Sequence, residues 1–359
     1  MILYAPRLAM RFLDYGILIP VLDSRAGAVV AGLERARPAR ARESIVEGLE
    51  GAARLLGIEP SALAVGRADL ERVHDARFVA RLYDGSPCGG LEKELLSTYE
   101  LIGSDGRPHR YEPDRAVRPL AALFDTILAQ VSASYATALL ALSEAGPMPG
   151  FAFFLGGGMH HARRDAGSGF CLVNDIMIAI ARLRAEGRAG LVWVIDTDAH
   201  KGDGTAELAA TDEDTLTLSI HMATGWPLDA ATVEAARRDG RGGSRAPLIP
   251  SDVEIPVARG EDARYVEYLA EGLGRLEALS RPRRPDLAVV VDGADPYAHD
   301  GLASSADLAL SLDQCLERDR LVHRFLSDRG IPAAWLMAGG YGERAWEPPT
   351  AFLSSITAG

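Results

Sequence analysis

Residues 191–204 read LVWVIDTDAHKGDG, in which five apolar residues are followed by acids, a histidine, a lysine and glycines. A short continuous run of β-branched and aromatic residues favours a strand that is buried on both faces, as the strands of a parallel sheet are. The polar residues that follow would then lie at the carboxyl end of this strand.

Other short apolar runs alternate with longer stretches of helical character. The predicted strands cover 2–5, 151–155, 191–196, 215–220, 287–292 and 333–338. The predicted helices cover 42–57, 68–84, 117–145, 172–187, 262–280 and 306–329. Loops rich in Pro, Gly and Arg are expected at 103–116, 238–250 and 281–285. This alternation predicts an α/β fold with a central, mainly parallel sheet flanked by helices, and residues 1–359 are expected to form a single domain.

Polar segments follow five of the predicted strands. They are GGGMHH (156–161), TDAHKGDG (197–204), HMATGWP (221–227), GADPYAHD (293–300) and GGYG (339–342). In an open parallel sheet, ligands bind beyond the carboxyl ends of the strands. We therefore expect these five segments to form one polar cluster at one edge of the sheet.

The segment TDAHKGDG (197–204) contains residues suited to binding a metal ion. Asp198 and His200 are two residues apart, so on an extended segment their side chains point the same way. Asp295, after another strand, would be a third ligand, leaving one position of a tetrahedral Zn²⁺ open for water. The alternative is that Asp196 and Asp198 only cap a following helix, as acids after strands often do.

Two adjacent histidines, His160 and His161, follow a glycine run. Hydrolysis by a metal-activated water needs a base and an acid, and imidazoles suit both roles near neutral pH. Asp196 and Asp203 could orient their other ring nitrogens. Tyr341 could donate its hydroxyl to an oxyanion. Taken alone, the histidines could be a surface pair and Tyr341 an ordinary turn residue.

The composition of the chain argues against several classes of binding partner. The formal net charge is −12, from 50 acidic and 38 basic residues, which argues against a nucleic-acid partner. The three cysteines, Cys88, Cys171 and Cys315, have no CxxC spacing, so neither a disulfide framework nor a cysteine zinc site is expected, and a reducing cytoplasm fits. No apolar run approaches ~18 residues and the N-terminus lacks a signal-peptide pattern, so no membrane association is expected.

Taken together, these motifs resemble the histone deacetylase family, which also includes acetylpolyamine amidohydrolases. The resemblance runs from about VHDARFV (73–79) to AGGYG (338–342). Its motifs, in order, are GGGMHHA, GFCLVND, DTDAHKGDGT, LSIH, GADP and GGY. It implies the arginase-deacetylase fold, a three-layer α/β sandwich, and a zinc-dependent amide hydrolase that removes an acetyl or other acyl group from an acyl-lysine or an acylpolyamine.

The resemblance also assigns roles to single residues. The zinc ligands would be Asp198, His200 and Asp295, with Fe²⁺ as another metal of similar preference. His161 would be the general base and acid, His160 its electrostatic partner, and Tyr341 would polarise the scissile carbonyl.

Further implied sites surround the zinc. A structural K⁺ would be bound by Asp196, Asp198, His200, Ser219 and Ile220. A looser monovalent site would use carbonyls of Ala209, Asp212 and Thr215. A narrow acyl-lysine tunnel would be lined by Gly169, Phe170, Trp226 and Leu302, although Phe170 and Trp226 could instead be core residues.

Some positions depart from the family pattern. Lys201 follows the ligand histidine where many relatives have histidine or glutamine, and Trp226 is bulkier than the common phenylalanine. The aspartate that binds the peptide backbone at the rim of peptide deacetylases has no clear match. Candidates in the 99–112 loop are Tyr99, Glu100, Asp105, Tyr111 and Glu112. Residues 14–26 would form another rim loop.

Two other hypotheses remain open at this point. One is an arginase-like ureohydrolase with two Mn²⁺ ions, which the DAH of DTDAH would suit but which needs further carboxylates. The other is a non-catalytic protein that binds acylated ligands. The acyl length, the choice between peptide and polyamine, and the oligomeric state are not determined by the sequence.

Overall fold

A parallel sheet of eight strands forms the centre of the computed structural model, which describes residues 1–86, 89–103, 105–228 and 248–356. The strand order is β2-β1-β3-β8-β7-β4-β5-β6, and every neighbouring pair is parallel. The strands are β1 (Ile2–Tyr4), β2 (Ile45–Glu47), β3 (Phe151–Phe154), β4 (Val192–Asp196), β5 (Thr215–Met222), β6 (Val253–Val257), β7 (Leu287–Asp292) and β8 (Ala333–Met337). The α/β fold expected from the sequence is confirmed.

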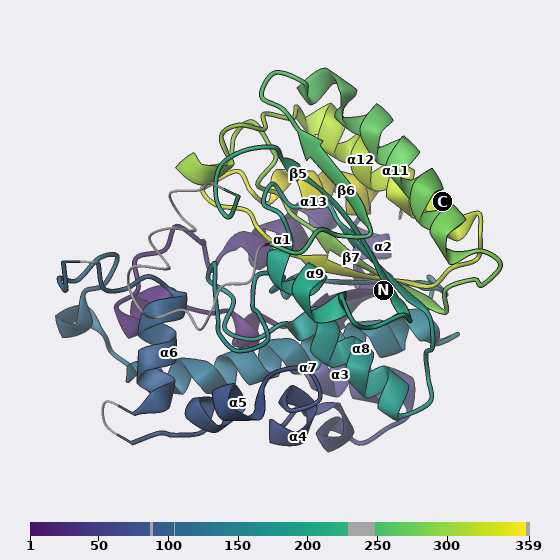
Figure 1. The fold of residues 1–359 in the computed structure, drawn as a ribbon. Coiled ribbons are helices and arrows are strands. Elements are labelled where there is room, and N and C mark those ends of the chain that lie inside the picture. The colour runs from purple at the N-terminus through teal and green to yellow at the C-terminus, as the bar shows by residue number, and fades with distance from the viewer. Residues whose placement is uncertain (87–88, 104, 229–247, 357–359) are drawn as a thin grey trace.

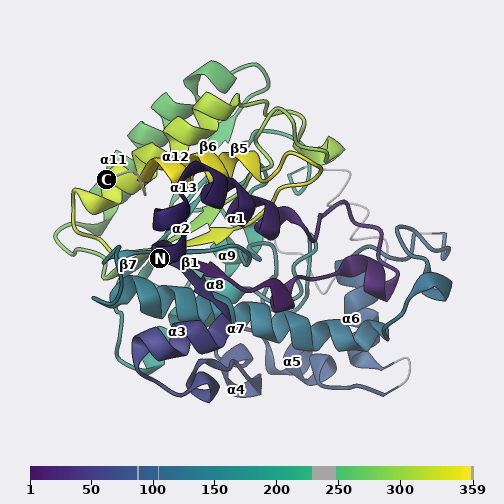
Figure 2. The same ribbon diagram turned by 180° about the vertical axis from the view of Figure 1, so that it is seen from behind.

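Helices cover both faces of the sheet and give three layers (Figure 1). One layer contains α3 (Gly48–Leu56), α4 (Arg67–Leu70), α5 (Ala76–Leu82), α6 (Gly90–Thr98), α7 (Leu123–Leu142) and α8 (Asp175–Ala185). The other contains α1 (Arg25–Ala36), α2 (Pro38–Ser44), α11 (Tyr265–Ser280), α12 (Leu312–Ser327) and α13 (Glu347–Ile356), and Figure 2 shows α1 beside α13 from behind. The short α9 (Asp203–Ala209) packs against β5 at the carboxyl ends of the strands.

Strand β4 shows why its sequence is apolar throughout. Val192 and Val194 belong to the core under α7 and α8, whereas Trp193 and Ile195 belong to the core under α11 and α12. Successive side chains of a strand point to opposite faces, so both layers need apolar residues here. Full burial of one such side chain contributes about 1.5–3 kcal/mol, which holds this central strand firmly in register.

One helix has the length and composition of a membrane span. The segment Leu120–Leu142 has a mean hydropathy of 1.3 over its best window, and 78% of that window is buried inside the protein. Helix α7 within it packs against β3, β8 and α8. Its apolar surface is therefore used in the core.

The predicted helix over 42–57 is wrong in its centre. Ile45–Glu47 form β2, which pairs with β1, and helices occupy only the two flanks. The β-branched residues Ile45 and Val46 fit a sheet edge, and this tertiary pairing outweighs the local helical pattern. The predicted helix over 68–84 is likewise divided into α4 and α5.

Some elements lie outside the predicted ones. Strand β6, with the sequence VEIPV, alternates as an edge strand does, and Pro256 is tolerated there because an edge strand need not donate every hydrogen bond. Helices α1, α6 and α13 also fall where no helix was expected. Most of the predicted loop 238–250 lies outside the described residues.

Candidate active site

The polar segments after β3, β4, β7 and β8 meet at the carboxyl edge of the sheet, as expected. Asp198, His200 and Asp295 are buried and offer ligand atoms that all lie within 4.8 Å of one another. Nδ1 of His200 is 3.3 Å from Oδ1 of Asp198 and 3.0 Å from Oδ2 of Asp295. We call these three residues the metal-ligand group, because two carboxylates and one imidazole are donors that Zn²⁺ accepts.

Backbone groups hold the two carboxylates in place. The N–H of Gly339 donates to Oδ2 of Asp198 at 3.0 Å, and the N–H of Ala199 donates to Oδ1 of Asp295 at 3.0 Å. A Cβ on Gly293 would lie 2.6 Å from the Cα of Asp198, so only glycine allows the β7 end to come this close.

The electrostatics of the metal-ligand group favour a cation. Burial alone would lower the pKa of His200, but its hydrogen bonds to Asp198 and Asp295 outweigh burial and raise the pKa to about 10. Burial and the nearby charge of Asp198 raise the pKa of Asp295. A positive charge between these carboxylates is therefore stabilised, whether it comes from a proton or from a metal ion.

The two adjacent histidines are each oriented by a different carboxylate. Nδ1 of His160 lies 2.6 Å from Oδ2 of Asp196, and Nδ1 of His161 lies 2.8 Å from Oδ1 of Asp203. The ring centroids of the two histidines are 3.9 Å apart. These contacts leave Nε2 of His161 without a partner carboxylate.

The same surroundings separate the protonation states of the two imidazoles. Burial would lower the pKa of His160, but Asp196 and Asp198 raise it to about 9. Burial, together with the charge of His160, lowers the pKa of His161 to about 4 against the opposing effect of Asp203. Near neutral pH, His160 is therefore a cation and His161 is a neutral base.

The glycine run before the histidines explains their position. Gly157 and Gly158 have φ values of 76° and 78°, which side chains rarely adopt, and a Cβ on Gly158 would lie 2.6 Å from the Cβ of Ala338. Asp175 at the start of α8 accepts from the N–H groups of Gly158 and Met159 at 3.0 and 2.6 Å. The turn therefore brings His160 and His161, which follow β3 in the chain, next to the metal-ligand group.

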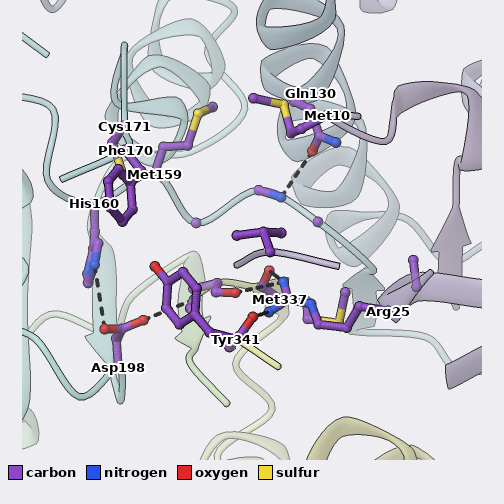
Figure 3. A pocket seen from close by; sticks show the side chains of 18 of the residues that line it. Met10, Arg25, Gln130, Met159, His160, Phe170, Cys171, Asp198, Met337 and Tyr341 are labelled. Carbon is purple, nitrogen blue, oxygen red and sulfur yellow. Dashed lines mark hydrogen bonds and ion pairs between the residues drawn. The ribbon is translucent and has the colours of Figure 1, made fainter. Parts of the chain in front are cut away.

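A cavity of about 170 Å³ adjoins these groups. Its lining includes His160, His161, Asp198, His200, Phe170 and Tyr341. Figure 3 shows the Tyr341 hydroxyl pointing into the space between His160, Phe170 and Asp198. Burial and the carboxylates of Asp295 and Asp198 raise the pKa of Tyr341 well above its usual range, so its phenol stays protonated and can donate.

The loop that carries Tyr341 is fixed by Asp300. Oδ2 of Asp300 accepts from the N–H of Tyr341 at 2.6 Å, while Oδ1 accepts from the N–H of Leu302 at 2.9 Å. Burial and the charge of Asp295 raise the pKa of Asp300 to about 7. One carboxyl group thus connects the loop of the phenol to a predicted tunnel residue.

The predicted tunnel residues lie around the site but not all line the cavity. Gly169 and Phe170 do, with φ values of 53° and 64°, and a Cβ on Gly169 would lie 2.6 Å from Cδ2 of His161. The ring of Trp226 lies 4.5 Å from that of His161 and 5.7 Å from that of His200, so it covers the metal-ligand group from another side. Leu302 is half-buried beside Ser304, whose hydroxyl lies 3.3 Å from Nε2 of His200.

The rim candidates divide into buried and exposed residues. Tyr99 is wrong as a rim residue, because it is completely buried in the core. Glu100 accepts from Arg110 at 3.0 Å, and the Arg110 guanidinium lies 5.4 Å from the centre of the Phe170 ring. Asp105 is exposed, Tyr111 is half-buried, and Glu112 pairs with Arg115.

Lys201, which departs from the family pattern, is buried and forms an ion pair with Glu254 on β6. His221 contacts the same carboxylate at 2.8 Å. Burial would raise the pKa of Glu254, but His221 and Lys201 outweigh it and lower the pKa to about 2. The unusual lysine therefore has a local partner that neutralises it.

Several lining residues could not be found from the sequence. Arg25 donates to the carbonyls of Gly340, Met337 and Ala338 at 2.8–3.0 Å, and Figure 3 shows it to the right of Tyr341. Gln130 on α7 accepts from the N–H of Gly157 at 3.1 Å. Arg25 lies within the predicted 14–26 rim loop, but no local pattern distinguishes it from the other arginines, because its partners are more than 300 residues away in the chain.

A buried Asp-His-Asp group beside two carboxylate-linked histidines, at the edge of a parallel α/β sheet, is the kind of arrangement that metal-dependent hydrolases use. Residues 34–351 match the family model of the histone deacetylase domain, and the chain belongs to this family. This membership supports a deacetylase-type hydrolase.

Several curated relatives are similar to this chain. An uncharacterized protein of Picosynechococcus sp. is 30% identical over 77% of this chain and 76% of its own length. The acetoin utilization protein AcuC of Bacillus subtilis is 33% identical, and histone deacetylase 2 of Arabidopsis thaliana is 32% identical, each over 54% of this chain. For these two, the match spans only 46% and 44% of the relative.

Proposed function

We propose that the chain is a Zn²⁺-dependent amide hydrolase that removes an acetyl or other acyl group from a primary amine, such as an acyl-lysine or an acylpolyamine. The observation that carries this proposal is the buried metal-ligand group, which lies beside a neutral His161 and a protonated Tyr341 on one cavity. Residues 1–359 would act as one catalytic domain, and the reducing cytoplasm remains the expected location.

The donor set fits the proposed ion. Asp198, His200 and Asp295 would hold it through two carboxylates and Nδ1 of the imidazole, and Fe²⁺ would accept the same ligands. When bound, the ion supplies an activated water and polarises the acyl carbonyl. The carboxylates of the group are already held by backbone N–H donors, so binding requires little rearrangement.

His161 would move the protons. Because Asp203 binds Nδ1, Nε2 is the atom that takes the proton of the attacking water and later returns it to the departing amine. Its low pKa, caused mainly by burial, keeps it unprotonated before the reaction. The cationic His160 would stabilise negative charge on the reacting centre.

Tyr341 would donate its hydroxyl to the oxyanion. Asp300 fixes the N–H of Tyr341, and Arg25 binds three carbonyls at the end of β8 and in the loop that follows, so the donor is held in position before the charge forms. Phe170 lies 6.5 Å from the Tyr341 ring and would form one wall for the acyl-lysine stem.

A structural K⁺ beside the metal-ligand group is part of the proposal. Asp196 and Ser219 are register neighbours on β4 and β5, and Oγ of Ser219 is buried without a hydrogen-bond partner in the described part of the chain. An orphaned buried hydroxyl is costly unless an ion binds it. The remaining ligands would come from Asp198, His200 and Ile220.

The looser monovalent site stays a prediction. It would use carbonyls of Ala209, Asp212 and Thr215. Arg184 pairs with the Asp212 carboxylate and donates to the Thr215 hydroxyl at 2.9 Å. The guanidinium therefore already occupies the side-chain oxygens of these two residues, and only their carbonyls would be left for an ion.

The ureohydrolase hypothesis lacks support in the described residues. Across 1–86, 89–103, 105–228 and 248–356, Asp198, His200 and Asp295 form the one group of three metal-ligating side chains. A second Mn²⁺ would need further carboxylates. The binding-protein hypothesis predicts a missing catalytic group, whereas the expected groups are all present.

The test is Tyr341→Phe with a panel of acetyl-lysine peptides, acetylated polyamines and longer acyl-lysines. Loss of one oxyanion donor costs on the order of 10²–10³ in turnover, so the variant should lose about that much at unchanged metal content. A chelator should abolish activity of the wild type. Unchanged turnover of Tyr341→Phe would exclude its assigned role, and hydrolysis of no substrate by the zinc-loaded wild type would exclude the function.

A further inference from the structure

A second buried ion cluster lies on the α11–α12 side of the sheet, apart from the imidazoles. It consists of Asp292 on β7 and of Arg318 and Asp319 on α12, and we call it the Arg318 cluster. Arg318 is completely buried. Its guanidinium donates to Oδ1 of Asp292 and to Oδ1 of Asp319, each at 2.6 Å.

The two hydrogens of Nη1 bind main-chain carbonyls. Nη1 of Arg318 donates to the carbonyl of Gly293 at 2.8 Å and to that of Thr197 at 3.2 Å. These carbonyls belong to two different strand ends, because Thr197 follows β4 and Gly293 follows β7. One rigid side chain therefore connects the two neighbouring strands just beyond the sheet.

The two connected segments carry the ligand carboxylates. Thr197 directly precedes Asp198, and Gly293 is two residues before Asp295. Gly293 is also close to both ligands, since a Cβ on it would lie 2.6 Å from the Cα of Asp198 and 2.7 Å from Oδ1 of Asp295. A shift of either carbonyl would change the separation of the two carboxylates.

Stability alone is a weak reason for such a cluster. A buried ion pair usually gains little over apolar residues of the same volume, because removing the charges from water offsets their attraction. A guanidinium held on two sides by carboxylates is, however, a rigid planar donor with a fixed orientation. This geometry suits it to fix the distance between two strand ends.

We propose that Arg318 is a positioning residue for the metal site, which it keeps in its ligand geometry by holding the carbonyls of Thr197 and Gly293. Asp292 and Asp319 set the orientation of the guanidinium. This inference rests on the metal site of the proposed function. It adds a group that touches neither substrate nor ion but determines how tightly the ion is bound.

The test compares Arg318→Lys with Arg182→Lys. The first keeps the positive charge, but one ammonium cannot hold both carbonyls and both carboxylates. Arg182 on α8 is a matched control, because it donates to the carbonyls of Ala62 and Ala64 and lies over the Tyr135 ring, away from the site. Zn²⁺ affinity is measured by competition with a chromophoric chelator, and thermal melting is followed on the zinc-free proteins.

Arg318→Lys should bind Zn²⁺ roughly 10–100-fold more weakly, as variants of groups behind metal ligands do. Arg182→Lys should lower the melting temperature without changing the affinity for Zn²⁺. Activity of Arg318→Lys should return at saturating Zn²⁺. An unchanged Zn²⁺ affinity in Arg318→Lys, or an equal loss in both variants, would overturn the inference.

A folding failure of Arg318→Lys is covered by a second variant. The triple replacement Asp292→Leu, Arg318→Met, Asp319→Leu removes the guanidinium and both acidic side chains together, which buried ion clusters often tolerate. It should fold and still bind Zn²⁺ more weakly, because the two carbonyls lose the guanidinium that connects them, and wild-type affinity would overturn the inference. If the wild type itself binds no Zn²⁺, the metal site of the proposed function fails, which is a different result.

Discussion

The Arg318 cluster and the metal-ligand group each place two carboxylates out of water near the end of β7, but only the first contains a permanent cation. Burial would lower the pKa of Arg318, yet Asp319 and Asp292 raise it well above its usual range. In the metal-ligand group the only cation is the imidazolium of His200, which can lose its proton. One cluster is complete by itself, and the other is suited to exchange a proton for a metal ion.

The comparison shows which partner a buried carboxylate needs in order to bind a metal ion. A carboxylate beside a guanidinium already faces a cation that does not lose its charge, so an external ion has no role to fill there. A carboxylate beside an imidazole can accept an external ion, because a neutral imidazole is itself a ligand. The following predictions test this contrast, from the largest expected effect to the smallest.

Asp295→Asn should break the metal-ligand group. Without this carboxylate the site loses a charged ligand, so we expect metal content to fall and activity to drop by on the order of 10³ or more, at least the cost of one oxyanion donor. Metal analysis and turnover on an acetyl-lysine peptide check this. Asp286→Asn, an exposed residue just before β7, is the control and should retain both metal content and activity. Full activity without metal in Asp295→Asn would contradict the assignment.

Arg318→Met should leave the two acidic side chains of the cluster buried without their guanidinium partner. Removing one side of a buried ion pair costs about 3–5 kcal/mol, so the free energy of unfolding should fall by that amount. Denaturant unfolding of the zinc-free protein measures it. Adding Asp292→Leu and Asp319→Leu should restore most of the loss. A single variant as stable as the wild type would show that the cluster is not held as described.

Zn²⁺ should stabilise the protein through the metal-ligand group alone. An ion present at 100 times its dissociation constant adds about 2.7 kcal/mol, because it binds only the folded state. The thermal midpoint of the wild type should rise with Zn²⁺, and that of Asp295→Asn should not. An equal rise in both would place the bound ion elsewhere.

Asp292→Asn should change the free energy of unfolding least at neutral pH, and this change should depend on pH in a characteristic way. Burial and the charge of Asp319 raise the pKa of Asp292 well above its ordinary value of 3.8, so the folded protein keeps a proton there that the unfolded chain releases. The wild type therefore loses stability as pH rises above about 3.8, and the asparagine variant lacks this contribution. Urea unfolding at acidic and alkaline pH should show the variant gaining relative to the wild type as pH rises. A constant difference would contradict the protonated state.

The site residues could be predicted from the sequence where they come directly after a strand. Asp198, His200, Asp295 and His161 stand just after apolar runs, and parallel strands bring their carboxyl ends together. Arg318 could not be found this way, because in LERDRLVHRF it resembles one more charge on an exposed helix face. Only the packing of α12 against the sheet shows that this face is buried.

The fold was predictable in its centre and less so at its edges. Strands β4, β7 and β8 are apolar on both sides, and no helix pattern competes with them. Strand β2 consists of three residues whose pairing with β1 depends on a partner more than 40 residues away, so local pattern alone favours a helix. Short edge elements of this kind are determined by tertiary contacts.

The side chains of β4 point alternately to the two helical layers, and this alternation limits which insertions the strand can tolerate. A single codon inserted within Val192–Asp196 would turn every following side chain to the other face, moving Asp196 away from His160. Such an insertion would leave the overall hydrophobicity unchanged and still remove the carboxylate that orients His160. Length variation among descendants of this gene should therefore accumulate in the connections between strands.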